Sequence, residues 1–194
     1  MLKIRMTFIS CNCGKCKIFL NYSKILYSLF CACEDCRQAA EWGFINGGLK
    51  PDKLQKLIYF RSDLSKVSGK KWMHSFQLRQ KADSTRIYCT NCYSIIGIDH
   101  TNYNDTMFML IPKLCKVNID TSITPIAAIQ MQDYIFDDKQ NLSKDIKFIE
   151  TYDPLLTKRY KLKYSKPEGI SFKNLISQIR GPKILNLKKG ESPI

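Results

Sequence analysis

Cysteine is the residue type through which this sequence is best equipped for chemistry. An odd number of clustered cysteines favours metal ligation or catalysis over a framework of disulfides. A thiolate is both a nucleophile and a ligand for soft metal ions, so each cluster is a candidate metal site. The nine cysteines are Cys11, Cys13 and Cys16, then Cys31, Cys33 and Cys36, then Cys89 and Cys92, and finally Cys115.

Two cysteine pairs have the spacing of structural zinc ligands. Cys11 and Cys13 form a C-x-C pair, and Cys89 and Cys92 form a C-x-x-C pair, each beside a predicted strand. A structural zinc ion takes four ligands in a tetrahedron. Two strands that the fold brings together would therefore complete a four-thiolate site. Cys16 is expected in the core, as a small hydrophobic residue, although a Cys13/Cys16 pair would displace Cys11 from the site.

The middle cluster places three thiols in the loop Cys31-Ala-Cys33-Glu-Asp-Cys36. Such a loop can bind one ion with three ligands and leave the fourth position open, which is the arrangement of catalytic rather than structural zinc. Cys115 lies in the apolar stretch "KLCKVNI" and is expected in the core of a strand. As a fourth ligand of this loop it would close the open position.

The elements that must position these thiols are mainly short strands. Runs rich in β-branched and aromatic residues, separated by turn-forming residues, predict a folded-over sheet or a sandwich. The stretch 17–30 reads as two strands joined by a tight turn, and the stretch 37–44 as a short helix. The other predicted strands are 56–62, 72–78, 84–88, 93–98, 106–111 and 116–119.

The last quarter of the chain has a different character, so we expect a β domain over residues 1–140 and a basic extension over 141–194. Within the extension, Phe172, Leu175, Ile176 and Ile179 have the spacing of a one-sided helix. Ser171 is a suitable N-cap and Pro182 prevents continuation. These features predict a short amphipathic helix over about 171–181.

The charge and hydropathy of the chain restrict its partners. The formal net charge is +14, and residues 155–194 carry ten Lys/Arg against two Glu. Such a balance favours nucleic acid, anionic lipid or a small acidic substrate. No apolar run approaches the ~20 residues of a membrane span, and the opening "MLKIRMTFIS" is too short and interrupted for a secretory signal. We therefore expect a cytoplasmic protein with reduced cysteines.

Three stretches together resemble the glutathione-dependent formaldehyde-activating enzyme (GFA) family, which also contains centromere protein V. "CNCGKCKI", "CACEDCR" and "RIYCTNC" follow, in order, that family's pattern of C-x-C-G, C-x-C-x-x-C-R and R-x-(aromatic)-C-x-x-C. Seven cysteines carry the resemblance, which covers roughly residues 7–136 and nothing after about residue 140.

The resemblance implies a mainly β fold of several small coiled antiparallel sheets, a β-tent, stapled by zinc. It implies two zinc ions, a structural one on Cys11, Cys13, Cys89 and Cys92 and a second one on Cys31, Cys33 and Cys36. It further implies that the second site is catalytic, as a carbon–sulfur lyase acting on a glutathione-like thiol and its adduct with formaldehyde. Arg37, directly after the last loop thiol, is then expected either to offset the local negative charge or to hold a carboxylate of the substrate.

The sequence also departs from the family pattern. Tyr93 stands where the family usually has glycine, and a turn that prefers positive φ would strain a tyrosine. The family's histidine before the late aromatic strand is missing, and the basic extension is additional. The alternative to an enzyme is therefore a non-catalytic zinc protein whose basic tail contacts nucleic acid or an acidic partner.

Overall fold

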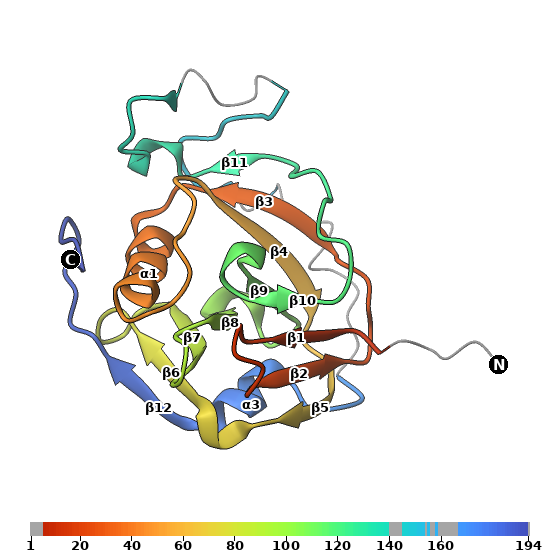
Figure 1. Cartoon of the computed structure of the whole chain (residues 1–194). Coiled ribbons are helices and arrows are strands. Elements are labelled where there is room, and N and C mark those ends of the chain that lie inside the picture. The colour runs from red at the N-terminus through yellow and green to blue at the C-terminus, as the bar shows by residue number, and fades with distance from the viewer. Residues whose placement is uncertain (1–5, 140–144, 154, 156–157, 159–166, 194) are drawn as a thin grey trace.

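Figure 1 shows a computed structural model of the chain, which describes residues 6–139, 145–153, 155, 158 and 167–193. The fold is mainly β, as the sequence predicts, and its strands form two sheets, one of them large, rather than several small ones. The four-stranded sheet has the order β10-β1-β2-β5, and the eight-stranded sheet has the order β11-β3-β4-β9-β8-β7-β6-β12. Pairs β3–β11 and β6–β12 are parallel, and the other pairs are antiparallel.

The strands are β1 (Phe8–Ser10), β2 (Lys17–Leu20), β3 (Tyr27–Cys31), β4 (Gln55–Arg61), β5 (Leu64–Ser68), β6 (Met73–Gln77), β7 (Ser84–Cys89), β8 (Ile95–His100), β9 (Met107–Leu110), β10 (Lys116–Val117), β11 (Ala128–Ile129) and β12 (Arg180–Ile184). The helices are α1 (Glu34–Ile45) and α3 (Phe172–Ser177), with 3₁₀ turns η1 (Lys70–Trp72), η2 (Thr101–Tyr103), η3 (Pro112–Leu114) and η4 (Met131–Asp133). Within the described residues, no helix has the length and apolar character that crossing a membrane requires.

The eight-stranded sheet separates two hydrophobic clusters. Successive residues of a strand point to opposite faces, so Leu57 and Tyr59 of β4 enter one cluster while Ile58 and Phe60 enter the other. The first cluster also contains the buried face of α1, and the second contains residues of β1, β2 and α3. Burial on both faces explains why the central strands read as nearly continuous apolar runs.

One sequence prediction about the sheets is wrong. The stretch 17–30 does contain two strands, but β2 pairs with β1 and β5 in the small sheet, whereas β3 pairs with β4 and β11 in the large one. The two strands therefore do not form a hairpin. Strand propensity is local, whereas the partner of a strand depends on which buried face its side chains must reach.

The C-terminal segment packs into the same core. The Phe172 ring is fully buried and stacks on Phe108 at 4.4 Å between ring centroids. A Cβ atom on Gly97 would lie 2.4 Å from the Phe172 ring, so only glycine allows this approach. The helix α3 ends at Ser177, earlier than the expected 181, because Arg180 already pairs with His74 of β6. β12 thus adds a strand beyond residue 140, where the β core was expected to end.

Candidate metal centres

Four cysteine sulfurs from the two sheets converge beside the turn between β7 and β8. Cys11 and Cys13 come from the loop between β1 and β2, Cys89 ends β7, and Cys92 lies in the turn before β8. All four sulfurs lie within 4.8 Å of one another, with 3.4 Å between Cys11 and Cys13 and 3.7 Å between Cys13 and Cys89. Zinc–sulfur bonds of about 2.3 Å place tetrahedral sulfurs roughly 3.8 Å apart. These residues, which we call the four-cysteine group, can therefore hold a metal ion.

Local hydrogen bonds shape the four-cysteine group. The backbone N–H of Cys16 donates to Cys11 Sγ at 3.2 Å, and Gly14 turns the loop with a φ of 78°. Burial alone would raise the pKa of Cys92, but hydrogen bonds from Ser94 outweigh it and lower the pKa to about 6. Cys92 is therefore readily available as a thiolate ligand at neutral pH.

Tyr93 adopts a positive φ, a backbone conformation that glycine adopts without strain. Its φ is 50°, and its N–H donates to the carbonyl oxygen of Cys89 at 2.8 Å, so the turn keeps its form. The ring packs against Trp42 and Tyr88, each at 5.7 Å between centroids. These aromatic contacts offset the backbone strain that tyrosine brings to this conformation.

The two remaining cysteines belong to the core. Cys16 and Cys115 are buried in the second hydrophobic cluster, and neither joins a metal-ligating group among the described residues. Burial raises the pKa of both thiols, that of Cys115 to about 12. Cys115 and the Cys31 loop lie in clusters on opposite faces of the eight-stranded sheet, so Cys115 does not close the loop's open position.

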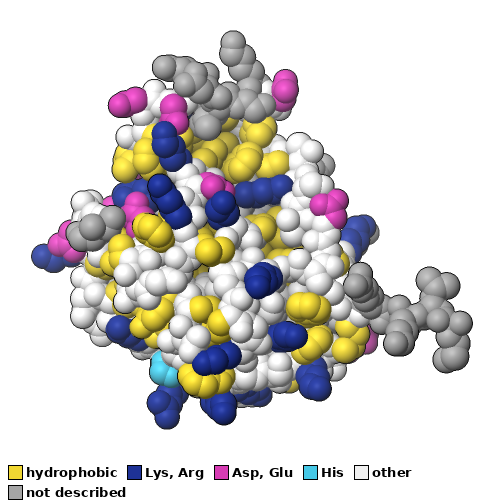
Figure 2. All heavy atoms as spheres, viewed as in Figure 1, with side chains coloured by type: hydrophobic (Ala, Val, Ile, Leu, Met, Phe, Trp, Pro, Cys, Tyr) yellow, Lys and Arg dark blue, Asp and Glu magenta, His cyan; other side chains and the backbone are white. Residues whose placement is uncertain are grey.

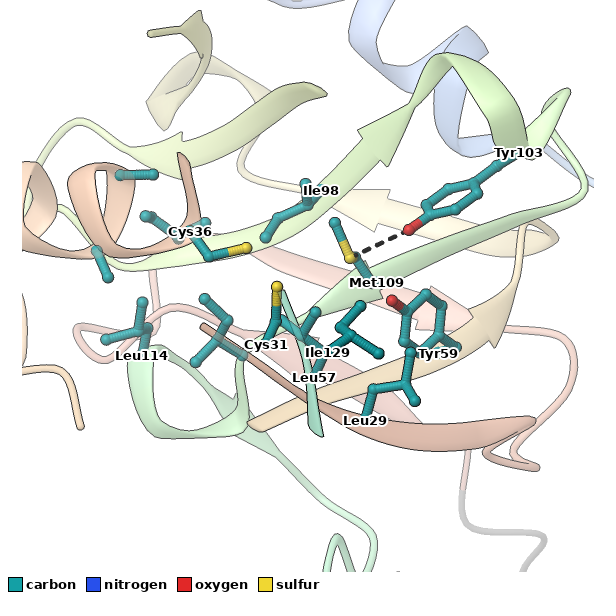
Figure 3. Packing of buried hydrophobic residues seen from close by; sticks show 14 of the residues in the cluster. Leu29, Cys31, Cys36, Leu57, Tyr59, Ile98, Tyr103, Met109, Leu114 and Ile129 are labelled. Carbon is teal, nitrogen blue, oxygen red and sulfur yellow. Dashed lines mark hydrogen bonds between the residues drawn. The ribbon is translucent and has the colours of Figure 1, made fainter. Parts of the chain in front are cut away.

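The second set of sulfurs meets where β3 passes into α1. Cys31 ends the strand, Cys33 is the N-cap of the helix, and Cys36 lies in the first helical turn. The Cys36 N–H donates to Cys33 Sγ at 3.3 Å, and the three sulfurs lie within 4.8 Å of one another. Figure 3 shows the sulfurs of Cys31 and Cys36 pointing toward each other. These residues, which we call the three-cysteine group, can also hold a metal ion.

The charge in the three-cysteine group is shared unequally. Hydrogen bonds to Cys33 and Cys36, together with burial, raise the pKa of Cys31. Hydrogen bonds from the Cys31 and Cys33 thiols hold the pKa of Cys36 well below its usual range, and the charge of Arg86 lowers it further. The N-terminal end of α1 also favours negative charge at this point. A hydrogen bond from Cys31 lowers the pKa of Cys33, but hydrogen bonding to Cys36 and burial outweigh it and raise that pKa, so the surroundings favour one anionic sulfur in the group, that of Cys36.

A cavity of about 340 Å³ opens beside the three-cysteine group. The three cysteines form part of its wall, and phenol rings form another part. In Figure 3 the hydroxyls of Tyr59 and Tyr103 point toward the side on which Cys31 and Cys36 lie. The Tyr103 hydroxyl donates to Met109 Sδ at 3.3 Å. A thioether is a weak acceptor, so this hydroxyl can turn to a stronger acceptor in a bound ligand.

Arg86, rather than Arg37, is the arginine that lines the cavity. The Arg37 guanidinium pairs with Glu34 at 3.8 Å and Glu41 at 3.3 Å, and its expected role in holding a substrate carboxylate stays a prediction. Arg86 is 1% exposed and donates to the Asp35 carbonyl oxygen at 3.1 Å, and its Nε has no hydrogen-bond partner among the described residues. A buried guanidinium needs a nearby anion, and the three-cysteine group supplies one. In the sequence, the position of Arg86 in the R-x-Y-C-x-x-C motif was the only feature that pointed to a role for this residue at the site.

The C-terminal extension contributes to the cavity wall through Tyr152 and Lys189. Gln38 of α1 donates to the carbonyl oxygens of Lys188 at 2.8 Å and Glu191 at 2.7 Å. Arg79 joins the same region by donating to Leu187 O at 3.1 Å and pairing with Asp35 at 2.7 Å. The end of the chain is thus fixed beside the first turn of α1, next to the three-cysteine group.

No protein-family model and no curated protein matches this chain. The two sulfur groups and the cavity are therefore the features that point to a function for this chain.

Proposed function

We propose that both cysteine groups bind zinc and that the chain is a member of the GFA and centromere protein V family. All seven donors are sulfur, and sulfur donors at tetrahedral spacing favour zinc among the abundant divalent ions. All nine cysteines are free, which fits the reducing cytoplasm that we propose as the location.

We further propose that the three-cysteine group is the catalytic centre of a carbon–sulfur lyase that acts on a glutathione-like thiol adduct of formaldehyde or a related aldehyde. One observation carries this proposal. Three sulfurs border a cavity, and among the described residues no fourth Cys, His, Asp or Glu joins their group. A zinc ion held by three thiolates supplies an open position that can take a substrate thiol as thiolate.

Two tyrosine hydroxyls in the cavity, those of Tyr59 and Tyr103, can bind the oxygen of the aldehyde with which such a thiol reacts. In the synthetic direction a carbon–sulfur bond forms between thiol and aldehyde, and the thiol proton ends on the aldehyde oxygen. The lyase direction reverses both changes. Burial raises the pKa of Tyr59 and Tyr103, so both stay protonated at neutral pH. A protonated phenol can donate a hydrogen bond to the oxygen as its charge develops.

A screen of small thiols with formaldehyde tests this function, with adduct formation followed for the zinc-loaded full-length protein. Cys33→Ser removes one ligand of the three-cysteine group and should abolish the rate enhancement. Cys16→Ala removes a buried thiol outside both groups and should leave the rate unchanged in folded protein. Tyr103→Phe should lower the rate about 10²–10³-fold through loss of one hydrogen-bond donor to the developing oxyanion. Equal rates for wild type and Cys33→Ser would end the catalytic proposal.

The non-catalytic alternative makes a different prediction about metal content. The catalytic proposal requires two zinc ions per chain in freshly purified reduced protein. A single ion, with the Cys31 loop empty or oxidised, would favour a zinc-stabilised binding protein. Much of the basic tail suggested for that alternative, residues 156–157 and 159–166 in particular, lies outside the described residues.

A further inference from the structure

Three stretches of the chain that contain Lys and Arg but no Asp or Glu lie together in the fold. These stretches are 11–33, 64–82 and 169–190. Strand β2 pairs with β5, and β12 pairs with β6, which joins them in space. Lys70 Nζ also donates to Gln178 Oε1 at 2.5 Å, which ties η1 to the end of α3. We call the surface that they build the basic face, made by Lys15, Lys17, Lys66, Lys70, Lys71 and Arg180.

The described residues do not neutralise the charges of the basic face. Within the described part of the chain, none of the six side chains pairs with a carboxylate. Figure 2 shows Lys and Arg side chains in both halves of the view, whereas acidic side chains gather mainly in the upper half and are scarce among the basic ones in the lower half. Lysines elsewhere do have partners, since Lys53 pairs with Asp138 at 2.6 Å and Lys139 with Glu150 at 3.1 Å.

Two further contacts show that the positive charge is concentrated. Burial lowers the pKa of His74, and the neighbouring charge of Arg180 lowers it further. Lys15 Nζ lies 4.0 Å and Lys71 Nζ 5.7 Å from the centre of the Trp72 ring, so two ammonium groups contact the same indole. Like charges kept this close repel each other. A polyanion that binds across them would relieve the repulsion.

The chemistry of the surface favours nucleic acid over a membrane. Surfaces that bind bilayers combine basic residues with exposed apolar side chains that enter the lipid. None of the large hydrophobic side chains that the described residues expose lies in β2, β5, η1, β6 or β12. We propose that the basic face binds the phosphate backbone of a nucleic acid. This site is separate from the cavity beside the three-cysteine group, and the proposal is independent of the lyase activity.

The test uses the zinc-loaded full-length protein and a fluorescently labelled single-stranded RNA of about 20 nucleotides, longer than a typical single binding site. Affinity is measured by fluorescence anisotropy between ~50 and ~200 mM salt. The test variant is Lys66→Gln/Lys71→Gln/Arg180→Gln. The matched control, Lys53→Gln/Lys113→Gln/Lys139→Gln, removes the same charge from lysines that already pair with carboxylates.

We expect the test variant to bind at least about tenfold more weakly at low salt. The slope of log K against log salt should fall by about 2, since each lost phosphate contact removes ~0.7. The control variant should stay within about twofold of wild type. Absence of RNA binding at ~50 mM salt, or equal losses in both variants, would overturn the proposal. Binding to phosphatidylserine vesicles without binding to RNA would overturn it in favour of a membrane surface.

Discussion

The four-cysteine and three-cysteine groups should differ sharply in what they contribute to stability, because they close loops of very different length. Cys13 and Cys89 are 76 positions apart and connect the two sheets, whereas Cys33 and Cys36 are 3 positions apart within one turn. Two double variants separate the effects. Cys89→Ser/Cys92→Ser removes the connection between the sheets, and Cys33→Ser/Cys36→Ser opens only the local group.

The entropy of loop closure sets the smallest difference that we expect between the free energies of unfolding of the two variants. A metal ion that stays bound in the unfolded chain acts as a cross-link, and the loop-entropy relation for cross-links gives about 4.5 kcal/mol for the long loop and about 1.6 kcal/mol for the short one. The difference is thus about 3 kcal/mol. If the ion dissociates on unfolding, the loss approaches the ~10–16 kcal/mol of apparent structural zinc binding. That exceeds the net stability of most domains, about 5–15 kcal/mol.

We therefore expect Cys89→Ser/Cys92→Ser to be unfolded or at least about 3 kcal/mol less stable than Cys33→Ser/Cys36→Ser. Serine at position 33 keeps a side-chain oxygen at the N-cap of α1, so the second variant should stay folded. Tryptophan fluorescence during guanidinium unfolding measures the difference, with zinc content determined on the same samples. A soluble Cys89→Ser/Cys92→Ser protein that melts like wild type would refute the reasoning.

Two other predictions concern the C-terminal segment. Phe172→Ala should destabilise the protein by about 3–5 kcal/mol, because the ring is fully buried against Phe108 and Gly97. The control is Lys173→Ala, a substitution at the exposed neighbouring residue, which should change the free energy of unfolding by no more than about 0.5 kcal/mol. Similar unfolding midpoints for the two variants would contradict the packing of α3 in the core. Burial alone would raise the pKa of Asp63, but hydrogen bonds from Asn21 and the N–H groups of Glu168 and Gly169 lower it. A lowered pKa stabilises the folded state above the unfolded value of about 3.9, and this stabilisation is lost as the pH falls through the folded value. Asp63→Asn should therefore lower the free energy of unfolding by about 2 kcal/mol at pH 7 and by progressively less below about pH 4. If the variant loses as much stability at low pH as at pH 7, the Asp63 carboxylate does not stabilise the fold through these hydrogen bonds.

The sequence predicts the sulfur groups well because their geometry is mostly local. A C-x-C or C-x-x-C pair brings two thiols together through one turn, so the grouping of Cys11 with Cys13 and of Cys89 with Cys92 follows from spacing. Their convergence required only that two predicted strands meet. The positive φ of Tyr93 could also be anticipated from the position of the turn, although the aromatic contacts that support it could not.

Long-range partners could not be predicted in the same way. The alternation of apolar residues in β2 and β3 shows that both are strands but does not show that they enter different sheets. Lys189 lies beside the three-cysteine group because Gln38 and Arg79 donate hydrogen bonds to the backbone of the last residues. No local sequence pattern predicts those contacts. The count of charged residues locates the excess of Lys and Arg in the tail. The basic face can be recognised only once it is known that β2 pairs with β5 and β12 with β6.

Strand β7 contributes residues to the surroundings of both cysteine groups and keeps the two groups apart. Ile87 and Cys89 point into the second cluster, where the four-cysteine group joins the sheets, while Tyr88 points into the first cluster and Arg86 lines the cavity. Because side chains alternate along a strand, one short segment serves both sites without bringing them into contact. A change at the three-cysteine group would then leave the four-cysteine group undisturbed. Such independence suits the catalytic role that we propose for the three-cysteine group, because a proposed open position would exchange ligands while the framework around it stays fixed.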